Sequence, residues 1–236
     1  MEKKIEIEII KREIEVKEKF YLTPNYIRII LSGPEVLAYS PVRVGANNKL
    51  LVPTEDGTLA RRTYTLRALD LDKMEMTIDF VAHGETGPAS KWAIKTVPGE
   101  RLTVMMKNRT RELVPEVNWY LIAGDHTALP VIAAILEGLD DQAEGIAYIE
   151  VYEELDIQDL KKPSGVKIQW LFNDLPGQSK QLTEHVIKTS FPEDKSKFVF
   201  AAAEHQSEIN SFLKEKMFQN DQYRTFAYWR LGQSEQ

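Results

Sequence analysis

The sequence of 236 residues contains no cysteine and only four histidines. Without cysteine the chain has no disulfides, no cysteine-ligated iron–sulfur cluster and no thiol redox chemistry. Four scattered histidines do not indicate an intrinsic metal centre either. We therefore expect no metal site, and we expect any electron transfer to depend on an organic cofactor.

Long apolar runs and an excess of positive charge are also missing. No stretch approaches the ~20 apolar residues of a membrane span, and residues 1–20 lack the apolar core of a signal peptide. We therefore expect no membrane span and a cytoplasmic location. The 30 Lys and Arg against 36 Asp and Glu give a net charge of −6, which argues against a nucleic-acid partner.

Hydrophobic residues make up 43% of the chain, enough for one large domain or two modest ones. The first half has alternating charged and aliphatic residues over 4–20 and strand-like runs at 26–31 and 48–53, with the spacing of a β-barrel. From about residue 115, apolar strands alternate with amphipathic helices, which predicts a parallel sheet covered on both faces. The strands are expected at 118–124, 145–152, 167–173, 197–203 and 223–230, and the helices at 126–139, 179–189 and 204–218. We expect domains at 1–112 and 113–236.

A strand-like run around Arg62, Tyr64 and Thr65 carries the most informative residues. Because side chains alternate along a strand, Arg62 and Tyr64 point to one face and Thr65 to the other. A guanidinium binds pyrophosphate through forked hydrogen bonds, and a tyrosine ring lies against a flat heterocycle. Thr65 offers its hydroxyl or its amide to a ring nitrogen. Taken alone, a tyrosine on a strand is also typical of simple packing.

About twenty residues later, the run GETGPAS forms a turn that opens a helix. The amides around Ala89 and Ser90 at the start of this helix favour an anion. Alone, such a turn does not indicate a binding site. Its position about twenty residues after the Arg62–Tyr64–Thr65 run makes the combination of the two more specific.

These two motifs, joined by DFVAHG and closed by Trp92, resemble the flavin-binding half of the siderophore-interacting proteins, a branch of the ferredoxin-reductase-like flavoenzymes. The resemblance covers about residues 15–232. It implies an N-terminal antiparallel flavin-binding β-barrel followed by a parallel-sheet nucleotide-binding α/β domain. It also implies FAD as the cofactor, with Tyr64 and Thr65 placed at the reacting ring. The implied FAD contacts in the barrel are Arg62, Tyr64, Thr65, Leu66, Asp79, Val81, His83, Gly87, Ala89, Ser90 and Trp92.

Functional residues of an open α/β sheet gather at the carboxyl ends of its strands. The first such end reads AGDHTALP, in which Gly124 allows close backbone approach and Thr127 and Ala128 begin a helix. In the family this loop receives a nicotinamide dinucleotide and commonly reads Gly-Asp-Glu-Thr-Ala-Leu-Pro. Here His126 replaces the Glu. The replacement is compatible with the shape of the loop but leaves the preference between NADH and NADPH open, because a histidine can pair with phosphate that a Glu would repel.

A second strand end reads AAAEHQSE, with Ala203 where the family usually has Gly. The methyl group of Ala203 is expected to leave a ligand less space beside the backbone. Glu204 either belongs to the nucleotide site or caps the following helix. The terminal Tyr-Trp-Arg is similar to that of the family, although alone it would be core packing beside a surface Arg. The implied cofactor contacts in this half are Gly124, Asp125, Thr127, Ala128, Glu204, Tyr228 and Trp229.

Basic residues cluster after the barrel, where the family usually has a Gly-Pro-Arg-Gly-like turn and this chain has MMKNRT. The cluster is either an exposed connector or a contact for an anionic ligand. Ferric siderophores are often anionic, so we expect a local basic surface to attract them. The candidate substrate contacts are Lys107, Arg109, Arg111 and Arg230.

The function implied by the resemblance is reduction of ferric siderophores to release ferrous iron. FAD would relay electrons from NADH, NADPH or a ferredoxin. Two alternatives stay open: a related flavoreductase that serves a protein acceptor, and a flavin- or siderophore-binding module without turnover. The second is suggested by the departures at Met106, His126 and Ala203.

Overall fold

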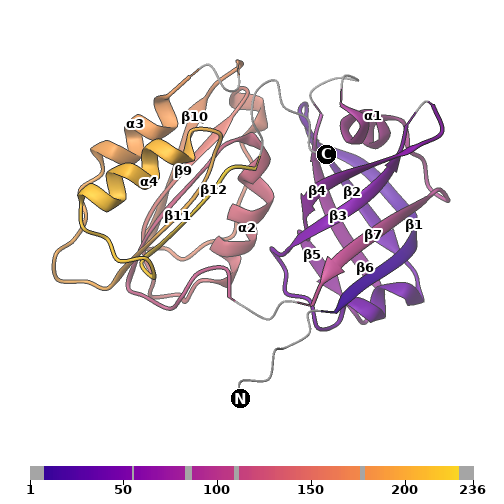
Figure 1. Ribbon diagram of the computed structural model, residues 1–236, viewed down its shortest axis with the longest axis horizontal. Coiled ribbons are helices and arrows are strands. Elements are labelled where there is room, and N and C mark those ends of the chain that lie inside the picture. Colours follow the sequence, from indigo (N-terminus) through magenta and orange to yellow (C-terminus); the bar gives the residue numbers. More distant parts are fainter. Residues whose placement is uncertain (1–7, 55, 83–86, 109–111, 176–178, 229–236) are drawn as a thin grey trace. The chain divides into compact units, whose positions relative to one another are not determined.

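A computed structural model describes residues 8–54, 56–82, 87–108, 112–175 and 179–228 of the chain. The chain divides into two compact units, Met1–Leu113 and Val114–Gln236, each with its own sheet (Figure 1). In the described residues, no helix has the length and apolar character needed to cross a membrane.

The first unit is built on a seven-stranded antiparallel sheet in the order β4-β3-β7-β1-β2-β6-β5. Its strands are β1 (Ile9–Thr23), β2 (Tyr26–Ser32), β3 (Asn47–Pro53), β4 (Leu59–Thr65), β5 (Ala68–Asp70), β6 (Glu75–Val81) and β7 (Arg101–Lys107). A 3-10 helix, η1 (Pro34–Tyr39), follows β2, and helix α1 (Pro88–Lys95) follows β6. Charged residues of β1 are mostly exposed while Ile14 and Val16 are buried, so the alternating charges form a solvated face.

The antiparallel sheet is curled. Tyr64 of β4 and Phe80 of β6 have ring centroids 4.4 Å apart, although four strands separate β4 from β6 in the sheet order. Such contact requires the two ends of the sheet to bend toward each other. The inner face encloses a core that includes Ile29, Leu50 and Val104, all fully buried.

The second unit is built on a five-stranded parallel sheet in the order β10-β9-β8-β11-β12. Its strands are β8 (Trp119–Gly124), β9 (Glu144–Val151), β10 (Val166–Phe172), β11 (Lys197–Ala202) and β12 (Tyr223–Phe226). The helical elements are η2 (His126–Ala128), α2 (Leu129–Gly138), η3 (Glu154–Asp156), α3 (Gln181–Lys188) and α4 (Gln206–Glu215). Helices α3 and α4 lie on one face of the sheet and α2 on the other (Figure 1). The antiparallel curled sheet and the covered parallel sheet confirm the predicted fold class.

The expected strands and helices of the second unit are present, although several are shorter than predicted, and the helix expected at 126–139 is divided into η2 and α2. Strand β12 ends at Phe226 and not at residue 230. Strand β8 is central, and the chain leaves it first toward β9 and β10 and later returns on its other side with β11. The carboxyl ends of β8 and β11 therefore form a topological switch point, where open α/β sheets bind ligands.

A glycine sets the alignment of β9 on β8. Gly145 stands opposite Tyr120, has φ of +151°, and a Cβ built on it would lie 2.0 Å from the carbonyl oxygen of Tyr120. Only glycine fits this backbone contact. The same alignment places Ile149 opposite Gly124, so Glu150 follows at the level of the loop after β8.

Candidate functional site

Strand β4 places a cation and an aromatic ring on one face of the curled sheet. Tyr64 stands opposite Asn48 of β3, and Arg62 stands opposite Leu50. Paired residues share a face, and both β3 partners are buried on the core side. Both Arg62 and Tyr64 are half-buried. The Nη1 of Arg62 donates to the carbonyl of Arg61 at 2.8 Å.

Three aromatic rings connect β4, β6 and α1. Phe80 lies between Tyr64, at 4.4 Å between centroids, and Trp92, at 5.7 Å. Phe80 is fully buried and Trp92 is 7% exposed, whereas Tyr64 is half-buried. The cluster therefore fixes the inner side of the Tyr64 ring against a rigid base and leaves part of that ring open.

Asp79 is held by arginines of its own unit. Its carboxylate accepts two hydrogen bonds of 2.7 Å from the guanidinium of Arg28, and the Nε of Arg67 lies 3.8 Å from its Oδ2. Asp79 is 5% exposed and Leu66 is fully buried in the core. Val81, the last residue of β6, is also buried. The side chains of these three predicted cofactor contacts therefore take part in internal packing and ion pairing.

Helix α1 begins at the Gly/Pro turn that the sequence indicated. Gly87 is its N-cap, makes no side-chain cap bond, and is followed by Pro88 in the first turn. Ala89 and Ser90 are 4% and 1% exposed. The glycine cap therefore contributes no side-chain acceptor to the first turn of the helix. His83, the remaining predicted contact of this region, lies outside the described residues.

Thr65 and Asn48 occupy buried positions beside the tyrosine. Thr65 is 4% exposed and ends β4. Asn48 is 1% exposed, and within the part of the chain that the structure describes neither its Nδ2 nor its Oδ1 has a hydrogen-bond partner. An enclosed amide without partners costs free energy unless a water or a rearrangement satisfies it. Sequence reasoning missed Asn48, because a single Asn near the start of a strand carries no motif.

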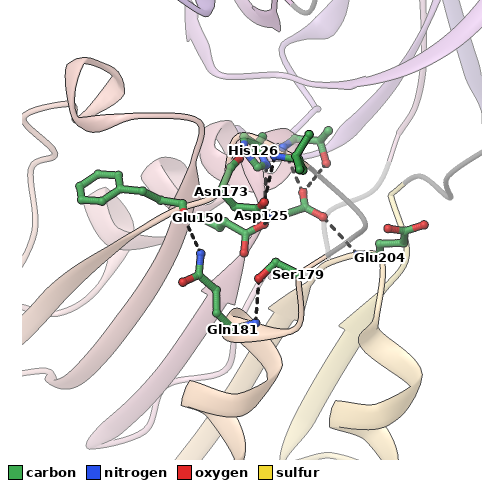
Figure 2. A network of polar contacts seen from close by, with 10 residues as sticks. Asp125, His126, Glu150, Asn173, Ser179, Gln181 and Glu204 are labelled. Carbon is green, nitrogen blue, oxygen red and sulfur yellow. Dashed lines mark hydrogen bonds and ion pairs between the residues drawn. The ribbon is translucent and has the colours of Figure 1, made fainter.

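In the second unit, Asp125 ties together the two loops of the switch point. Its Oδ1 accepts from the amide of Thr127 at 3.0 Å and from the hydroxyl of Thr127 at 2.7 Å. Its Oδ2 accepts from the amide of Glu204, beyond β11, at 3.1 Å. Figure 2 shows this carboxylate between the loops after β8 and β11. Asp125 is 3% exposed, so it shapes the site from within.

Gly124 is needed for packing inside the chain. A Cβ at this position would lie 2.6 Å from the Cβ of Ala128 and 2.6 Å from Cδ1 of Ile132. The close approach that the sequence predicted is therefore made by the start of α2 onto the end of β8. Ala128 is fully buried, while Thr127 is half-buried.

His126 points into the protein. The residue is 1% exposed, its Nε2 lies 3.0 Å from the carbonyl oxygen of Asn173, and its ring centroid lies 4.0 Å from that of Tyr152. An enclosed ring with its Nε2 already bonded does not present itself to a ligand phosphate. The structure therefore argues against a direct pairing of His126 with phosphate.

Two residues that sequence reasoning missed complete this cluster. Glu150 of β9 accepts a hydrogen bond of 2.9 Å from Nδ2 of Asn173, which follows β10. Burial raises the pKa of Glu150 to about 7, with the nearby Asp125 carboxylate adding to the effect and the Asn173 bond opposing it. Burial lowers the pKa of His126, which the carboxylates of Asp125 and Asp156 partly offset. A polar residue at the end of each of two buried strands was the signal available in the sequence.

The second loop of the switch point starts with Ala203, which is 4% exposed and donates its amide to the carbonyl of Phe226 at 3.0 Å. Glu204 is half-buried, and the N-cap of α4 is His205, so Glu204 does not occupy the capping position. Tyr228 has its ring centroid 6.2 Å from that of Phe226, and burial raises its pKa.

Of the predicted substrate contacts, Lys107 ends β7 and is exposed. Arg109, Arg111 and Arg230, together with the predicted cofactor contact Trp229, lie outside the described residues. No group of three or more His, Asp or Glu side chains able to hold a metal occurs in the ranges that the structure describes.

Each half of the chain matches a known protein family. Residues 53–109 match the sequence model of the siderophore-interacting FAD-binding domain, and residues 117–232 match the model named siderophore-interacting protein. A siderophore utilization protein from T. fusca superposes with a TM-score of 0.90 at 30% identity, covering 97% of each chain. The siderophore-interacting protein SipS from Aeromonas hydrophila superposes with a TM-score of 0.84 at 27% identity, covering 95% of this chain and 93% of its own.

Among curated proteins, the ferric vibriobactin reductase ViuB of Vibrio cholerae is 27% identical over 248 aligned positions, which cover 95% of this chain and 91% of that protein. The matches extend over both units and agree with the observed sheets. The chain therefore belongs to the siderophore-interacting protein family.

Proposed function

We propose that this protein is an FAD-dependent oxidoreductase that reduces ferric siderophores and so releases ferrous iron. NADH or NADPH is the proposed electron donor, with a ferredoxin as the other candidate. The observation that carries the proposal is the face of β4, where Arg62 and the Phe80-backed ring of Tyr64 lie side by side within the segment that matches the FAD-binding domain model.

Two features of the first unit fit FAD. A half-buried tyrosine ring on a rigid aromatic base offers a flat surface of the kind that stacks on a heterocycle. The start of α1, capped by a glycine that has no side chain to bond the first amides, offers donors for a phosphate. When bound, FAD supplies the conversion of a two-electron donor into one-electron steps.

The residues of the first unit divide this work by chemistry. Arg62 is proposed to hold the pyrophosphate with its forked donors, together with the amides around Ala89 and Ser90. Tyr64 orients the isoalloxazine by stacking, and Thr65 donates or accepts at a ring nitrogen. Trp92 supports this surface through Phe80.

The second unit is proposed to bind the dinucleotide at the switch point between β8 and β11. Asp125 holds the loop of residues 125–128 in shape by accepting from Thr127 and joins it to the loop of Glu204. Thr127 is the half-buried residue of the first loop, and it is the proposed contact with the donor. Tyr228 and Glu204 complete the proposed set.

Iron is proposed to arrive already chelated. The described residues contain no metal-ligand cluster, so the ferric ion is treated as part of the substrate. The exposed ammonium of Lys107 is proposed to attract anionic chelates, in a chain whose net charge is −6. Such attraction weakens with ionic strength.

A visible absorption spectrum is the first test. The purified protein is expected to be yellow or to take up added FAD, to be reduced anaerobically by NADH or NADPH, and to be reoxidised by a ferric siderophore with ferrous iron captured by a chelating dye. A colourless folded protein that does not bind FAD would contradict the cofactor. Flavin that stays reduced with hydroxamate, catecholate and carboxylate chelates, yet reacts quickly with a protein acceptor, would favour the related flavoreductase.

The donor site has its own test. Replacing Thr127→Trp adds bulk at the proposed nucleotide loop and is expected to slow flavin reduction while FAD stays bound. Ser211→Trp adds the same bulk at an exposed position further along α4 in the same unit and is expected to leave the rate unchanged. Equal rates in the two variants and the wild type would mean that the donor docks elsewhere.

A further inference from the structure

The carboxyl ends of β8, β9 and β10 meet in an enclosed polar cluster (Figure 2). His126 is 1% exposed, Glu150 is 4% exposed and Asn173 is 6% exposed. Asn173 connects the other two. Its main-chain carbonyl oxygen lies 3.0 Å from Nε2 of His126, and its side-chain Nδ2 donates to Oε1 of Glu150 at 2.9 Å. The proposed function gives no role to this cluster.

The bond to Asn173 settles which ring nitrogen of His126 carries hydrogen. A carbonyl oxygen only accepts, so Nε2 must donate, and in a neutral ring Nδ1 is then a bare acceptor. Nδ1 lies 3.8 Å from Oε1 of Glu150. An unprotonated ring nitrogen and a carboxylate oxygen enclosed at this distance repel each other, unless a proton lies on one of them.

The second oxygen of Glu150 points to the same conclusion. Oε2 is enclosed and has no hydrogen-bond partner among the residues that the structure describes. An ionised carboxylate with one unpaired buried oxygen is costly, whereas a neutral carboxyl tolerates such surroundings better.

We propose that His126 and Glu150 jointly hold one proton inside the second unit and that this pair positions the loop of residues 125–128. With the proton, the pair is neutral overall and His126 rests between Asn173 and Glu150. Without it, a buried negative charge stands beside Asp125, whose carboxylate organises the same loop.

The groups around the pair decide where the proton lies. Asp125 acts on it from the end of β8 and Asp156 from η3, while Gln181 on α3 partly offsets the raised pKa of Glu150. The pKa of Tyr152, whose ring packs on His126, is raised to about 12, so this phenol stays neutral. Because burial lowers the pKa of His126 and raises that of Glu150 to about 7, the proton resides on Glu150 and leaves near neutral pH.

Proton counting gives this pair a distinctive effect on stability. In the unfolded chain His126 titrates near its usual 6.5 and Glu150 near its usual 4.5. Between these values the unfolded pair holds one proton, on the histidine, and the folded pair also holds one, on the carboxyl. Stability depends on pH only when the two states bind different numbers of protons, so the pair contributes no slope in this window.

Removing either partner is expected to reveal a slope, and the two slopes have opposite signs. In Glu150→Gln only the histidine titrates, and the folded state binds fewer protons, so stability falls as pH decreases below 6.5. In His126→Gln only the carboxyl titrates, and the folded state binds more protons, so stability falls as pH rises from 4.5 to about 7. Each slope approaches about tenfold in the unfolding equilibrium constant per pH unit.

The experiment is urea unfolding of the full chain at several pH values from 4.5 to 7.5, with each variant referred to the wild type. Glu193→Gln, at an exposed position outside the helices and strands, is the charge-matched control and is expected to run parallel to the wild type. The double variant Glu150→Gln, His126→Gln is also expected to run parallel. Single-variant profiles that are parallel to the wild type, or that slope the same way, would overturn the proposal.

Imidazole nitrogen NMR of the wild type keeps the proposal testable if a variant fails to fold. We expect His126 to show hydrogen on Nε2 with Nδ1 unprotonated at pH 6, where a solvent-exposed histidine is mostly charged. A fully protonated ring at pH 6, or hydrogen on Nδ1 alone, would contradict the assignment.

One consequence rests on the proposed function. If the loop of residues 125–128 binds a dinucleotide, loss of the proton should weaken NADH binding several-fold between pH 6 and 8, and Glu150→Gln should remove this dependence. NADH is the probe because its pyrophosphate keeps a constant charge over this range. Absence of NADH binding at every pH would refute the donor site, while the unfolding profiles would still decide whether the proton is shared.

Discussion

The two candidate sites are assembled from polar residues in opposite ways. In the first unit, Arg62, Tyr64 and Thr65 follow one another on β4, and the first two are half-buried. In the second unit, Asp125, Glu150 and Asn173 come from three strand ends and are 3%, 4% and 6% exposed. A site made on one strand is visible as a motif, whereas a site made by strand ends appears only when the sheet aligns them.

Physical role also differs between the sites. The Arg62 and Tyr64 side chains of β4 are half-buried, and the Phe80 ring packed against Tyr64 supplies rigidity. Asp125 and Glu150 accept hydrogen bonds from other residues of the protein, namely Thr127 and Asn173. Substitutions in the first site should therefore change binding more than folding, except at Phe80, and substitutions in the second should change folding first.

Phe80→Ala should give the largest effect and tests whether the aromatic base is structural. Removal of a fully buried ring that contacts Tyr64 and Trp92 is expected to lower the free energy of unfolding by about 3–5 kcal/mol. Urea unfolding of the whole chain measures the loss. Phe20→Ala, at a position 38% exposed, is the matched control, and an equal loss in both variants would show that Phe80 has no special supporting role.

Asp125→Ala comes next and tests whether the switch point is held together from within. The change leaves the amides of Thr127 and Glu204 without their acceptor, which is expected to cost about 2–4 kcal/mol of unfolding free energy. Asp125→Asn keeps one accepting oxygen and is expected to lose about half as much. A stable Asp125→Ala protein with unchanged unfolding would mean that water replaces the carboxylate.

Tyr64→Ala should weaken FAD binding by about 1 kcal/mol, close to fivefold, because one aromatic contact is lost while its base remains. Titration of the apoprotein with FAD, followed by flavin fluorescence, measures the affinity. Tyr21→Ala removes an exposed tyrosine of β1, 53% accessible, and is expected to bind FAD normally. Unchanged affinity in the double variant Arg62→Ala, Tyr64→Ala would remove this strand from the FAD site.

Lys107→Gln should give the smallest effect. Loss of one exposed charge is expected to raise the apparent KM for an anionic ferric chelate by about twofold at low salt, with less change in kcat, and the difference should vanish as ionic strength rises. Lys167→Gln removes an equivalent exposed charge from β10 and serves as the control. An identical rise in both variants would indicate a general charge effect.

Much of the fold was predictable, because periodicity reports which residues face a core. Alternation along 4–20 and apolar runs such as 118–124 indicated an antiparallel and a parallel sheet, and both are present. The end of β12 was not predictable, since the aromatic residues after Phe226 continue the same pattern.

Within the sites, prediction succeeded for local geometry and failed for long-range contacts. The shared face of Arg62 and Tyr64 follows from the strand period alone. The burial of His126 depends on Asn173, 47 positions away, and on Glu150 reaching the same level of the sheet. Gly124 was predicted to admit a ligand, but the space is taken by Ala128 and Ile132, which no local pattern reveals.

The glycine at the start of β9 has a consequence for how this chain assembles. Because only a glycine fits against the carbonyl of Tyr120 at this position, Gly145 fixes the register of β9 on β8. A slip of one residue would turn Glu150 to the opposite face of the sheet. The chemistry at the far end of the strand is thus set by a residue that has no side chain, and errors in assembly there would produce a folded sheet with an altered site.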